Sequence, residues 1–224
     1  MREVVLDTET TGLDPAVGHR IVEIGCVELL NHVATGKTWQ AYINPERDMP
    51  EEAFAVHGLS ETFLADKPTF HAVVDDFMAF VGDSKLVIHN ADFDLKFINA
   101  ELAALDRVAI SRERAVDTVS MARRKFPGAP ASLDALCKRF SVDSSARTKH
   151  GALLDSELLA EVYLELIGGR QPGLSLAANA GPQANVPVAE REIRPPRPHT
   201  PTAAEIDAHE AFLERDVTSP IWKQ

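Results

Sequence analysis

Two carboxylates at the end of an apolar run constrain this chain more than any other feature. In the stretch VVLDTETTG, residues 4–12, the apolar residues lead directly into Asp7 and Glu9. Side chains alternate between the two faces of an extended strand, so Asp7 and Glu9 point to the same side. Carboxylates placed in this way repel each other unless a positive group lies between them, and Mg²⁺ prefers carboxylate oxygens and water. The stretch therefore predicts a buried strand with a divalent cation site at its end.

Further apolar runs predict an α/β domain. Residues 3–44 hold three runs rich in β-branched and aromatic residues, and we expect an antiparallel meander of three strands there. Short strands are also expected at residues 85–90 and 115–117. Helical spacing predicts helices over residues 69–81, from about residue 94 to 105, and over 118–126, 132–140 and 152–167. Strands followed by helices indicate a mixed sheet with helices on both faces.

The composition is typical of a soluble globular protein, with 45% hydrophobic and 25% charged residues. The chain passes directly into an apparent strand and holds no apolar run near the ~20 residues of a spanning helix, so we expect a cytoplasmic location. Its cysteines, Cys26 and Cys137, lie far apart without histidine or cysteine at ligand spacing, which argues against a zinc site or a disulfide framework. We expect both thiols to be buried.

The net charge of −11 argues against a protein that coats nucleic acid electrostatically. However, residues 107–149 carry ten lysine or arginine residues against four acids, a local net charge of +6. This basic segment is a candidate phosphate-binding surface. The alternative is that its charges lie on solvated helix faces.

The composition changes at Gly168. Seven of the fourteen prolines fall within residues 168–201, where no periodicity is present. We therefore predict a domain at residues 1–168, a flexible linker at 169–201 and a C-terminal helical segment at 202–224. In that last segment Thr202 and Glu205 have the spacing of a capping box.

The predicted C-terminal helix has an apolar stripe that it cannot bury alone. We expect it to dock on a partner, and the alternative is that it folds back on its own domain. The residues expected to make the contact are Ile206, His209, Phe212, Leu213 and Trp222, with Ile221 beside them.

More candidate ligands lie in two later stretches. Asp94 follows the strand expected at residues 85–90, and Asp155 lies among leucines on the last helix of the domain. A buried carboxylate in such surroundings requires a hydrogen bond, a positive side chain or a metal. His150, five residues before Asp155, does not share its helix face, so we place it on the preceding loop as a candidate proton acceptor. Each residue alone is more typical of a surface or turn position, and only their combination and order indicate a site.

The motifs DTETTG, HNADFD and HGALLD, in this order, resemble the three motifs of the DEDDh, or DnaQ-like, 3′–5′ exonucleases. The resemblance covers roughly residues 3–168 and includes EAFAVHG, DKPTF, FPG with SLDALC, and LAEVY. It implies an RNase H-like fold with a mixed five-stranded sheet. It also implies that Asp7, Glu9, Asp94 and Asp155 bind two divalent cations, Mg²⁺ or Mn²⁺, and that His150 is the general base. The family has a neutral residue where this chain has Asp92, so no ligand role is expected there.

The resemblance further implies the substrate and the reaction. The expected contacts with the terminal nucleotide are made by Asp7, Glu9, Thr10, Thr11, Glu52, Val56, His57 and Asp155. The activity would be hydrolysis of the 3′-terminal phosphodiester of DNA, releasing a 5′-mononucleotide, as proofreading for a replicative polymerase. A mispaired 3′ end frays, and only an unpaired end enters a site built for a single strand.

The tail resembles partner-binding segments of replication proteins. QPGLSL, residues 171–176, is similar to peptides that bind the sliding clamp, through Gln171, Leu174 and Leu176. By the same resemblance, the C-terminal helix anchors the chain to a polymerase catalytic subunit, and a small accessory subunit is a further possible partner of the nuclease domain. Two alternatives remain open: a free-standing exoribonuclease of the same fold, and an inactive binding module, against which the complete set of acids argues.

Overall fold

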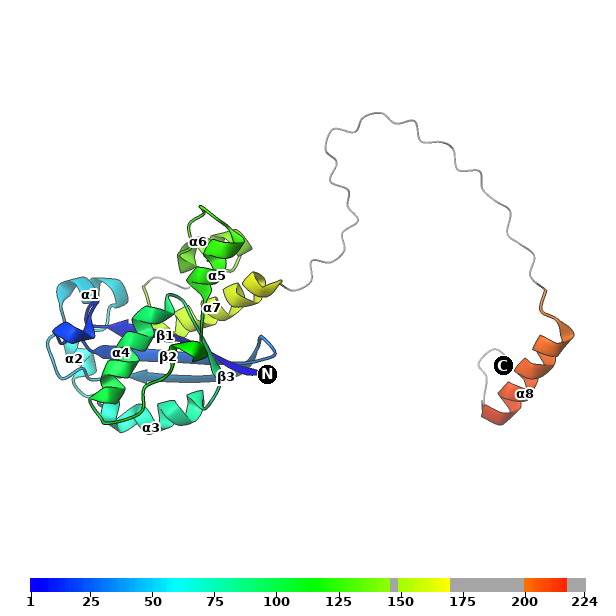
Figure 1. Cartoon of the computed structure of the whole chain (residues 1–224), viewed down its shortest axis with the longest axis horizontal. Coiled ribbons are helices and arrows are strands. Elements are labelled where there is room, and N and C mark those ends of the chain that lie inside the picture. The colour runs from blue at the N-terminus through cyan, green and yellow to red at the C-terminus, as the bar shows by residue number, and fades with distance from the viewer. Residues whose placement is uncertain (146–148, 170–199, 217–224) are drawn as a thin grey trace, which may run out of the picture. The chain divides into compact units, whose positions relative to one another are not determined.

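The computed structural model describes residues 1–145, 149–169 and 200–216. The chain divides into two units, Met1–Ser175 and Leu176–Gln224. Five strands in the first unit form one sheet in the order β3-β2-β1-β4-β5. Figure 1 labels the first three of them, β1, β2 and β3. The strands are β1 (Arg2–Thr10), β2 (Ile21–Leu30), β3 (Val33–Tyr42), β4 (Lys85–Ile88) and β5 (Ala115–Asp117). Pairs β1/β2 and β2/β3 are antiparallel and pairs β1/β4 and β4/β5 are parallel, which confirms the predicted meander and mixed sheet.

Helices cover both faces of this sheet. The α-helices of the first unit are α1 (Glu51–His57), α2 (Glu61–Leu64), α3 (Phe70–Val81), α4 (Ala91–Ala103), α5 (Thr118–Lys125), α6 (Leu133–Phe140) and α7 (Ala152–Ile167). Alternate residues of β1 supply the two cores. Val4 and Leu6 pack with α3 and α4, whereas Val5 packs on the opposite face with α5, α6 and α7. The site described below lies where β1 ends between these two layers.

Two short helices and one boundary differ from the sequence expectation. Helices α1 and α2 were not predicted, because each is shorter than two amphipathic repeats. A local signal for α1 is nevertheless present: Glu51 and Glu52 open its first turn, and Gly58 ends it in the left-handed conformation with φ 74°. Helix α4 begins at Ala91, one turn before the expected start near Asp94.

Several basic residues of the segment at residues 107–149 interact with other groups of the same domain. Arg107 forms an ion pair with Asp75 at 2.6 Å, and Arg114 donates to the backbone carbonyls of Gly82 and Ser84. Lys125 donates to the Glu165 and Leu166 carbonyls at the end of α7, a favourable place for a cation. Arg123, Arg124 and Lys138 are exposed, as the solvated-face alternative expects, and phosphate binding by the segment stays a prediction.

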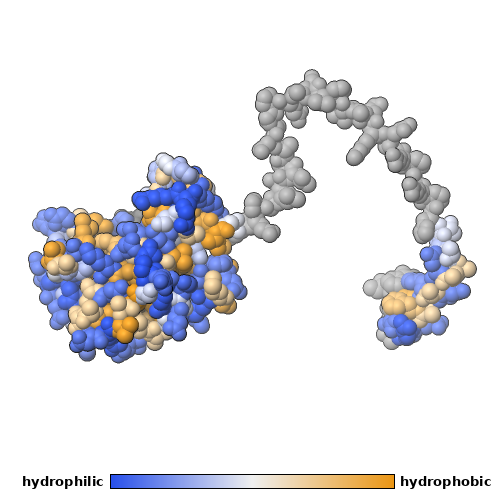
Figure 2. Space-filling view, viewed as in Figure 1, coloured by the Kyte–Doolittle hydropathy of each residue, from blue (hydrophilic) through white to orange (hydrophobic). Residues whose placement is uncertain are grey.

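The second unit contains α8 (Ala203–Asp216). Its expected capping box is confirmed, since the Thr202 backbone N–H donates to Glu205 Oε2 at 2.8 Å and the Glu205 N–H donates to Thr202 Oγ1 at 3.3 Å. Ile206 and Phe212 are exposed and Leu213 is buried. Hydrophobic residues on the visible face of α8 lie among hydrophilic ones (Figure 2).

Two expectations from composition also have structural counterparts. Cys26 and Cys137 are both buried, as predicted. Within the described part of the chain, no helix has the length and apolar character needed to cross a membrane.

Candidate active site

The end of β1 presents two acids to one face of the sheet. Asp7 lies opposite Gly25 of β2 and Glu9 lies opposite Glu23, with an irregularity in the register directly after Glu9. Both acids share the strand face of Val5, on which α7 packs. The predicted common orientation of Asp7 and Glu9 is therefore observed.

Asp94 reaches the same place from the other face of the sheet. It lies in the first turn of α4 and is 3% exposed. Thr8, between the two acids of β1, points to the α4 side, and its Oγ1 donates a 2.7 Å hydrogen bond to Asp94 Oδ1. Because side chains alternate along β1, Asp7 and Glu9 point to the face covered by α7, whereas Thr8 points to the face covered by α4 and orients Asp94.

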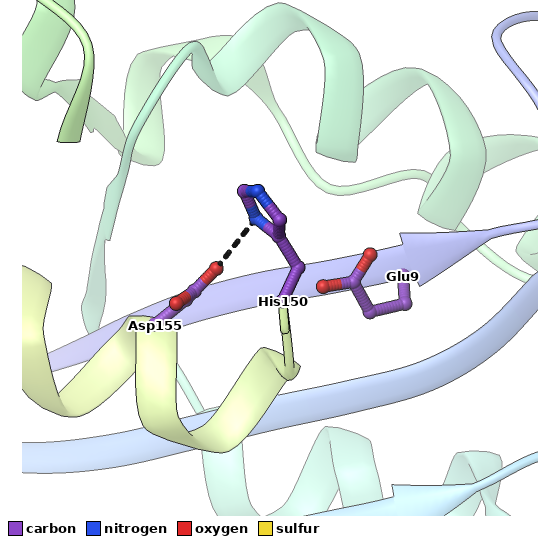
Figure 3. Close-up of side chains that lie close together, drawn as sticks. All are labelled: Glu9, His150 and Asp155. Atoms are coloured by element: carbon purple, nitrogen blue, oxygen red, sulfur yellow. Dashed lines mark hydrogen bonds and ion pairs between the residues drawn. The ribbon is translucent and has the colours of Figure 1, made fainter. Parts of the chain in front are cut away.

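Helix α7 brings the remaining two residues. Asp155 lies in its first turn and is 3% exposed, and His150 lies on the loop before it, as expected (Figure 3). The His150 Nδ1 is 3.1 Å from Asp155 Oδ2, and the imidazole side chain is 47% exposed. The His150 backbone N–H donates to the Val56 carbonyl at 3.3 Å, which ties this loop to α1.

A glycine permits the close approach of α7 to the sheet. A Cβ at Gly25 would lie 2.2 Å from the backbone nitrogen of Leu153 and 2.3 Å from the carbonyl carbon of Ala152, so no larger residue fits without moving the helix. Ser156 adds a 3.0 Å hydrogen bond from its Oγ to the Gly25 carbonyl oxygen. Because Gly25 lies opposite Asp7, this contact sets the first turn of α7 beside the acids of β1.

These five groups surround one cleft of about 280 Å³, which Asp7, Glu9, Asp94, His150 and Asp155 all line. Ligand atoms of Glu9, His150 and Asp155 lie within 4.8 Å of one another. Asp92 lies elsewhere: it forms an ion pair with Arg112 and is 78% exposed. The structure therefore brings together every acid that the sequence motifs singled out and leaves out the one they set aside.

The electrostatics of the cleft favour a cation. Burial raises the pKa of Asp7 well above its ordinary value, and the negative charges of Asp94, Glu9 and Asp155 raise it further. Burial also raises the pKa of Asp94 to about 7, against the opposing effect of the hydrogen bond from Thr8. Carboxylate oxygens are the donors that hard divalent cations prefer, so these residues fit such ions.

A second cavity of about 510 Å³ adjoins the cleft and shares Thr8, Glu9 and Phe93 with it. Its lining includes all the other expected substrate contacts: Thr10, Thr11, Glu52, Val56 and His57. His57 is buried, and burial lowers its pKa. Its Nδ1 accepts a 3.0 Å hydrogen bond from the Leu59 N–H, so the neutral ring carries its proton on Nε2.

The cleft also includes residues that sequence reasoning missed: His89, Phe93, Ser132, Leu133 and Asp134. His89 and Phe93 lie within the HNADFD motif, and Ser132, Leu133 and Asp134 open the SLDALC stretch, where Ser132 caps α6. Membership of these stretches is the one sequence signal that could have suggested them. The His89 Nδ1 lies 2.9 Å from Thr118 Oγ1, which orients the ring. Of the expected partner-binding residues, Gln171, Leu174, Leu176 and Trp222 lie outside the described residues, whereas Ile206, His209, Phe212 and Leu213 lie on α8.

Comparisons with known proteins agree with this geometry. A family model described as exonuclease matches residues 4–163. The chain is 52% identical over 223 residues to the DNA polymerase III subunit epsilon of Rickettsia conorii, covering 96% of each chain. It is 43% identical over 225 residues to the same subunit of Escherichia coli, covering 95% of this chain and 92% of that one.

Solved structures share the fold. A structure of exonuclease X with 5′ overhanging duplex DNA has 26% identity and a TM-score of 0.58, covering 74% of this chain and 90% of that one. The nuclease domain of 3′hExo, described as a DEDDh family member and bound to rAMP, has 21% identity and a TM-score of 0.63, covering 74% and 91%. The fold is therefore the RNase H-like exonuclease fold. Given these matches and the cleft, the chain belongs to the DnaQ-like exonuclease family and, within it, to the family of DNA polymerase III epsilon subunits.

Proposed function

We propose that this chain is a metal-dependent 3′–5′ exodeoxyribonuclease that removes mispaired 3′ ends for DNA polymerase III. The observation that carries the proposal is the single cleft lined by Asp7, Glu9, Asp94, His150 and Asp155. Family membership supports the same reaction.

The four acids would hold two divalent cations, Mg²⁺ or Mn²⁺. When bound, such ions activate water and offset negative charge on a phosphodiester. Asp94 enters this arrangement already oriented by Thr8, and Asp155 by its place in the first turn of α7. The raised pKa values of Asp7 and Asp94 are consistent with a site completed by positive charge.

His150 would act as the general base. Its Nδ1 contacts Asp155 Oδ2, which orients the ring, and its exposed side chain is accessible to the attacking water. As His150 takes the proton, the water oxygen forms a bond to phosphorus and the bond from phosphorus to the 3′-oxygen of the preceding nucleotide breaks. That oxygen keeps the bonding electrons and takes up a proton from water to become the new 3′-hydroxyl. The product is a 5′-deoxynucleoside monophosphate.

The adjoining cavity would receive the terminal nucleotide. Thr10 and Thr11 offer hydroxyl groups for the sugar and phosphate, Glu52 offers an acceptor for a sugar hydroxyl, and Val56 offers an apolar contact for the base. His57 lines the same cavity, and its buried neutral ring helps to shape the wall beside Thr10. A cavity of this size accepts one unpaired nucleotide, so selection follows from fraying of the 3′ end.

The test is release of mononucleotides from a 3′-labelled, single-stranded DNA oligonucleotide with Mg²⁺. We expect Asp7→Ala to abolish release and His150→Ala to slow it by about 10²- to 10⁴-fold, the usual contribution of a general base. Asp92→Ala is the matched control, because Asp92 is exposed and pairs with Arg112. Full activity in Asp7→Ala would refute the metal assignment.

A matched RNA oligonucleotide tests the exoribonuclease alternative, and we expect DNA to be degraded faster.

We also propose the division into a nuclease domain at residues 1–168, a linker at 169–201 and a polymerase-binding segment at 202–224. Helix α8 would bind the polymerase III catalytic (alpha) subunit, and Gln171, Leu174 and Leu176 would bind the sliding clamp (beta). The nuclease domain would accept a small theta-like subunit. Membership in the epsilon family supports these proposed partners and a cytoplasmic location.

A further inference from the structure

We infer that Glu23 is a positioning residue that holds the first turn of α7, and through it His150 and Asp155, against the end of β1. The inference rests on the proposed nuclease function, because it concerns the same cleft. Glu23 does not line that cleft, so it would act only through α7.

Glu23 is a buried acid whose hydrogen bonds lead to one helix end. It is 2% exposed, on β2 opposite Glu9. Its Oε1 accepts a 2.7 Å hydrogen bond from Gln40 Nε2. Burial raises the pKa of Glu23, and Gln40 together with the backbone N–H groups of Ala152 and Leu153 opposes that rise. These N–H groups lie on the same face of β2, because a Cβ at Gly25, two residues along the strand, would be 2.2 Å from the Leu153 nitrogen. A buried carboxylate facing three donors has little capacity left for a metal ion.

The two backbone donors are the first two residues of α7. The first four N–H groups of a helix have no partner within the helix, and a side chain at the N-cap normally accepts from them. The N-cap of α7 is Gly151, which has no side chain and makes no such bond. Glu23 of β2 accepts in place of the missing N-cap side chain, and an acidic group is favourable at the N-terminal, positive end of a helix.

This cap lies between the two active-site residues of α7. His150 directly precedes Gly151, and Asp155 begins the helical ladder, its N–H donating to the Gly151 carbonyl at 2.8 Å. Gly25 permits the close contact of helix and sheet, and Glu23 fixes the helix end there. A displacement of about 1 Å at reacting groups can cost about 10²-fold in rate, so loss of this cap should reach the chemistry.

The chain offers a matched control at the other end of the same helix. Glu3 of β1 is 1% exposed, and its Oε1 accepts a 2.8 Å hydrogen bond from the Tyr163 hydroxyl of α7. Its Oε2 lies 2.6 Å from His32 Nδ1. Glu3 and Glu23 are therefore both buried acids on the sheet that bind α7, but only Glu23 binds the end that carries His150 and Asp155.

The experiment compares Glu23→Gln, Glu23→Ala and Glu3→Gln in the full chain. The first readout, on metal-free protein, is hydrogen exchange at the amides of Ala152 and Leu153. The second is Mn²⁺ binding by calorimetry, and the third is kcat and KM on a single-stranded oligonucleotide. Glu23→Gln keeps the side-chain volume but removes the negative charge and one of the two acceptor oxygens, so it weakens the cap with the least disturbance of packing, and Glu23→Ala removes the cap altogether.

We expect both Glu23 variants to exchange these two amides at least about tenfold faster than wild type. Metal affinity or kcat should fall by about 10- to 100-fold, as for other residues that orient metal ligands, with KM within about twofold of wild type. Glu3→Gln should lower the melting temperature yet leave kcat and Mn²⁺ affinity unchanged.

Equal loss of kcat in Glu3→Gln and Glu23→Gln, in proportion to the folded fraction, would overturn the inference. Unchanged exchange at Ala152 and Leu153 would do the same. If both Glu23 variants fail to fold, hydrogen exchange in the wild-type protein tests the inference. Amides of Ala152 and Leu153 that exchange without protection there would contradict the cap. An inactive wild type whose amide protection still depends on Glu23 would refute the nuclease proposal and not the cap.

Discussion

At the residue scale, the buried acids of the cleft lower the free energy of unfolding of the metal-free protein when they are ionised. The pKa of Asp94 is raised to about 7 by burial, so in the folded protein its ionised form is disfavoured relative to the unfolded chain. A raised pKa in the folded state adds stability that is fully present below the unfolded pKa and is lost as pH rises through the folded value. The cost of ionising Asp94 therefore grows between about pH 4 and pH 7.

Asp94→Asn tests this cost. In EDTA at about pH 7.5, the variant should be more stable than wild type by on the order of a few kcal/mol, and the difference should vanish near pH 4. Mg²⁺ should reverse the order by stabilising wild type more than the variant. Urea denaturation at both pH values, with and without Mg²⁺, measures these effects. Asp92→Asn, which removes an exposed carboxylate, should change little, and a wild type that Mg²⁺ does not stabilise would contradict the cation site.

At the element scale, acidic side chains on neighbouring strands bind the N-terminal ends of helices. Asp117, at the end of β5, accepts N–H groups from Val119 of α5 and from Asn90 before α4. Burial raises the pKa of Asp117, but hydrogen bonds from Ser120 and from backbone N–H groups outweigh burial and leave the pKa below its ordinary value. One carboxylate thus caps α5 and fixes the start of α4, which carries Asp94.

Asp117→Ala should lower the free energy of unfolding by about 1–2 kcal/mol at neutral pH, the usual cost of a lost N-cap. Since the folded pKa of Asp117 is lowered, its contribution is present above the unfolded pKa and is lost as pH falls through the folded value. The difference from wild type should therefore shrink below about pH 4. Urea denaturation at neutral and acidic pH measures it, with the exposed Asp66→Ala as control; a pH-independent difference would count against the charged cap.

The sequence predicted elements better than the contacts between them. Alternation placed Asp7 and Glu9 on one face, and helical spacing found α7 with its bounds. The meeting of Asp94 and Asp155 with those acids came from resemblance to a family, because pairing of distant segments is not encoded in local periodicity. Glu23 could not be identified at all: it is one of two glutamates among the mainly apolar residues of β2, and its role depends on a helix end far along the chain.

At the scale of the whole molecule, the chain carries a net charge of −11, and its sites for DNA and for partners are expected in separate parts. A nuclease tethered to its polymerase gains a high effective concentration from the tether and needs little affinity of its own for DNA. Helix α8 leaves Ile206 and Phe212 exposed, which is consistent with a docking role for this segment.

Deleting residues 169–224 should leave the rate of oligonucleotide degradation within about twofold of the full chain and abolish co-purification with the polymerase catalytic subunit. The double substitution Ile206→Ala and Phe212→Ala, in an otherwise intact chain, should weaken co-purification without affecting nuclease activity. Pull-down and the labelled-oligonucleotide assay measure the two properties in parallel. Loss of nuclease activity on deletion would argue against independent parts.

The separation of the site's components along the chain has a consequence for biosynthesis. Asp7 and Glu9 leave the ribosome early, whereas Asp155 lies on the last helix of the first unit. A chain still lacking α7 has neither His150 beside Asp155 nor a closed cleft. Since long-range contacts form late in folding, we expect a nascent or partly folded chain to lack nuclease activity until α7 has packed on the sheet.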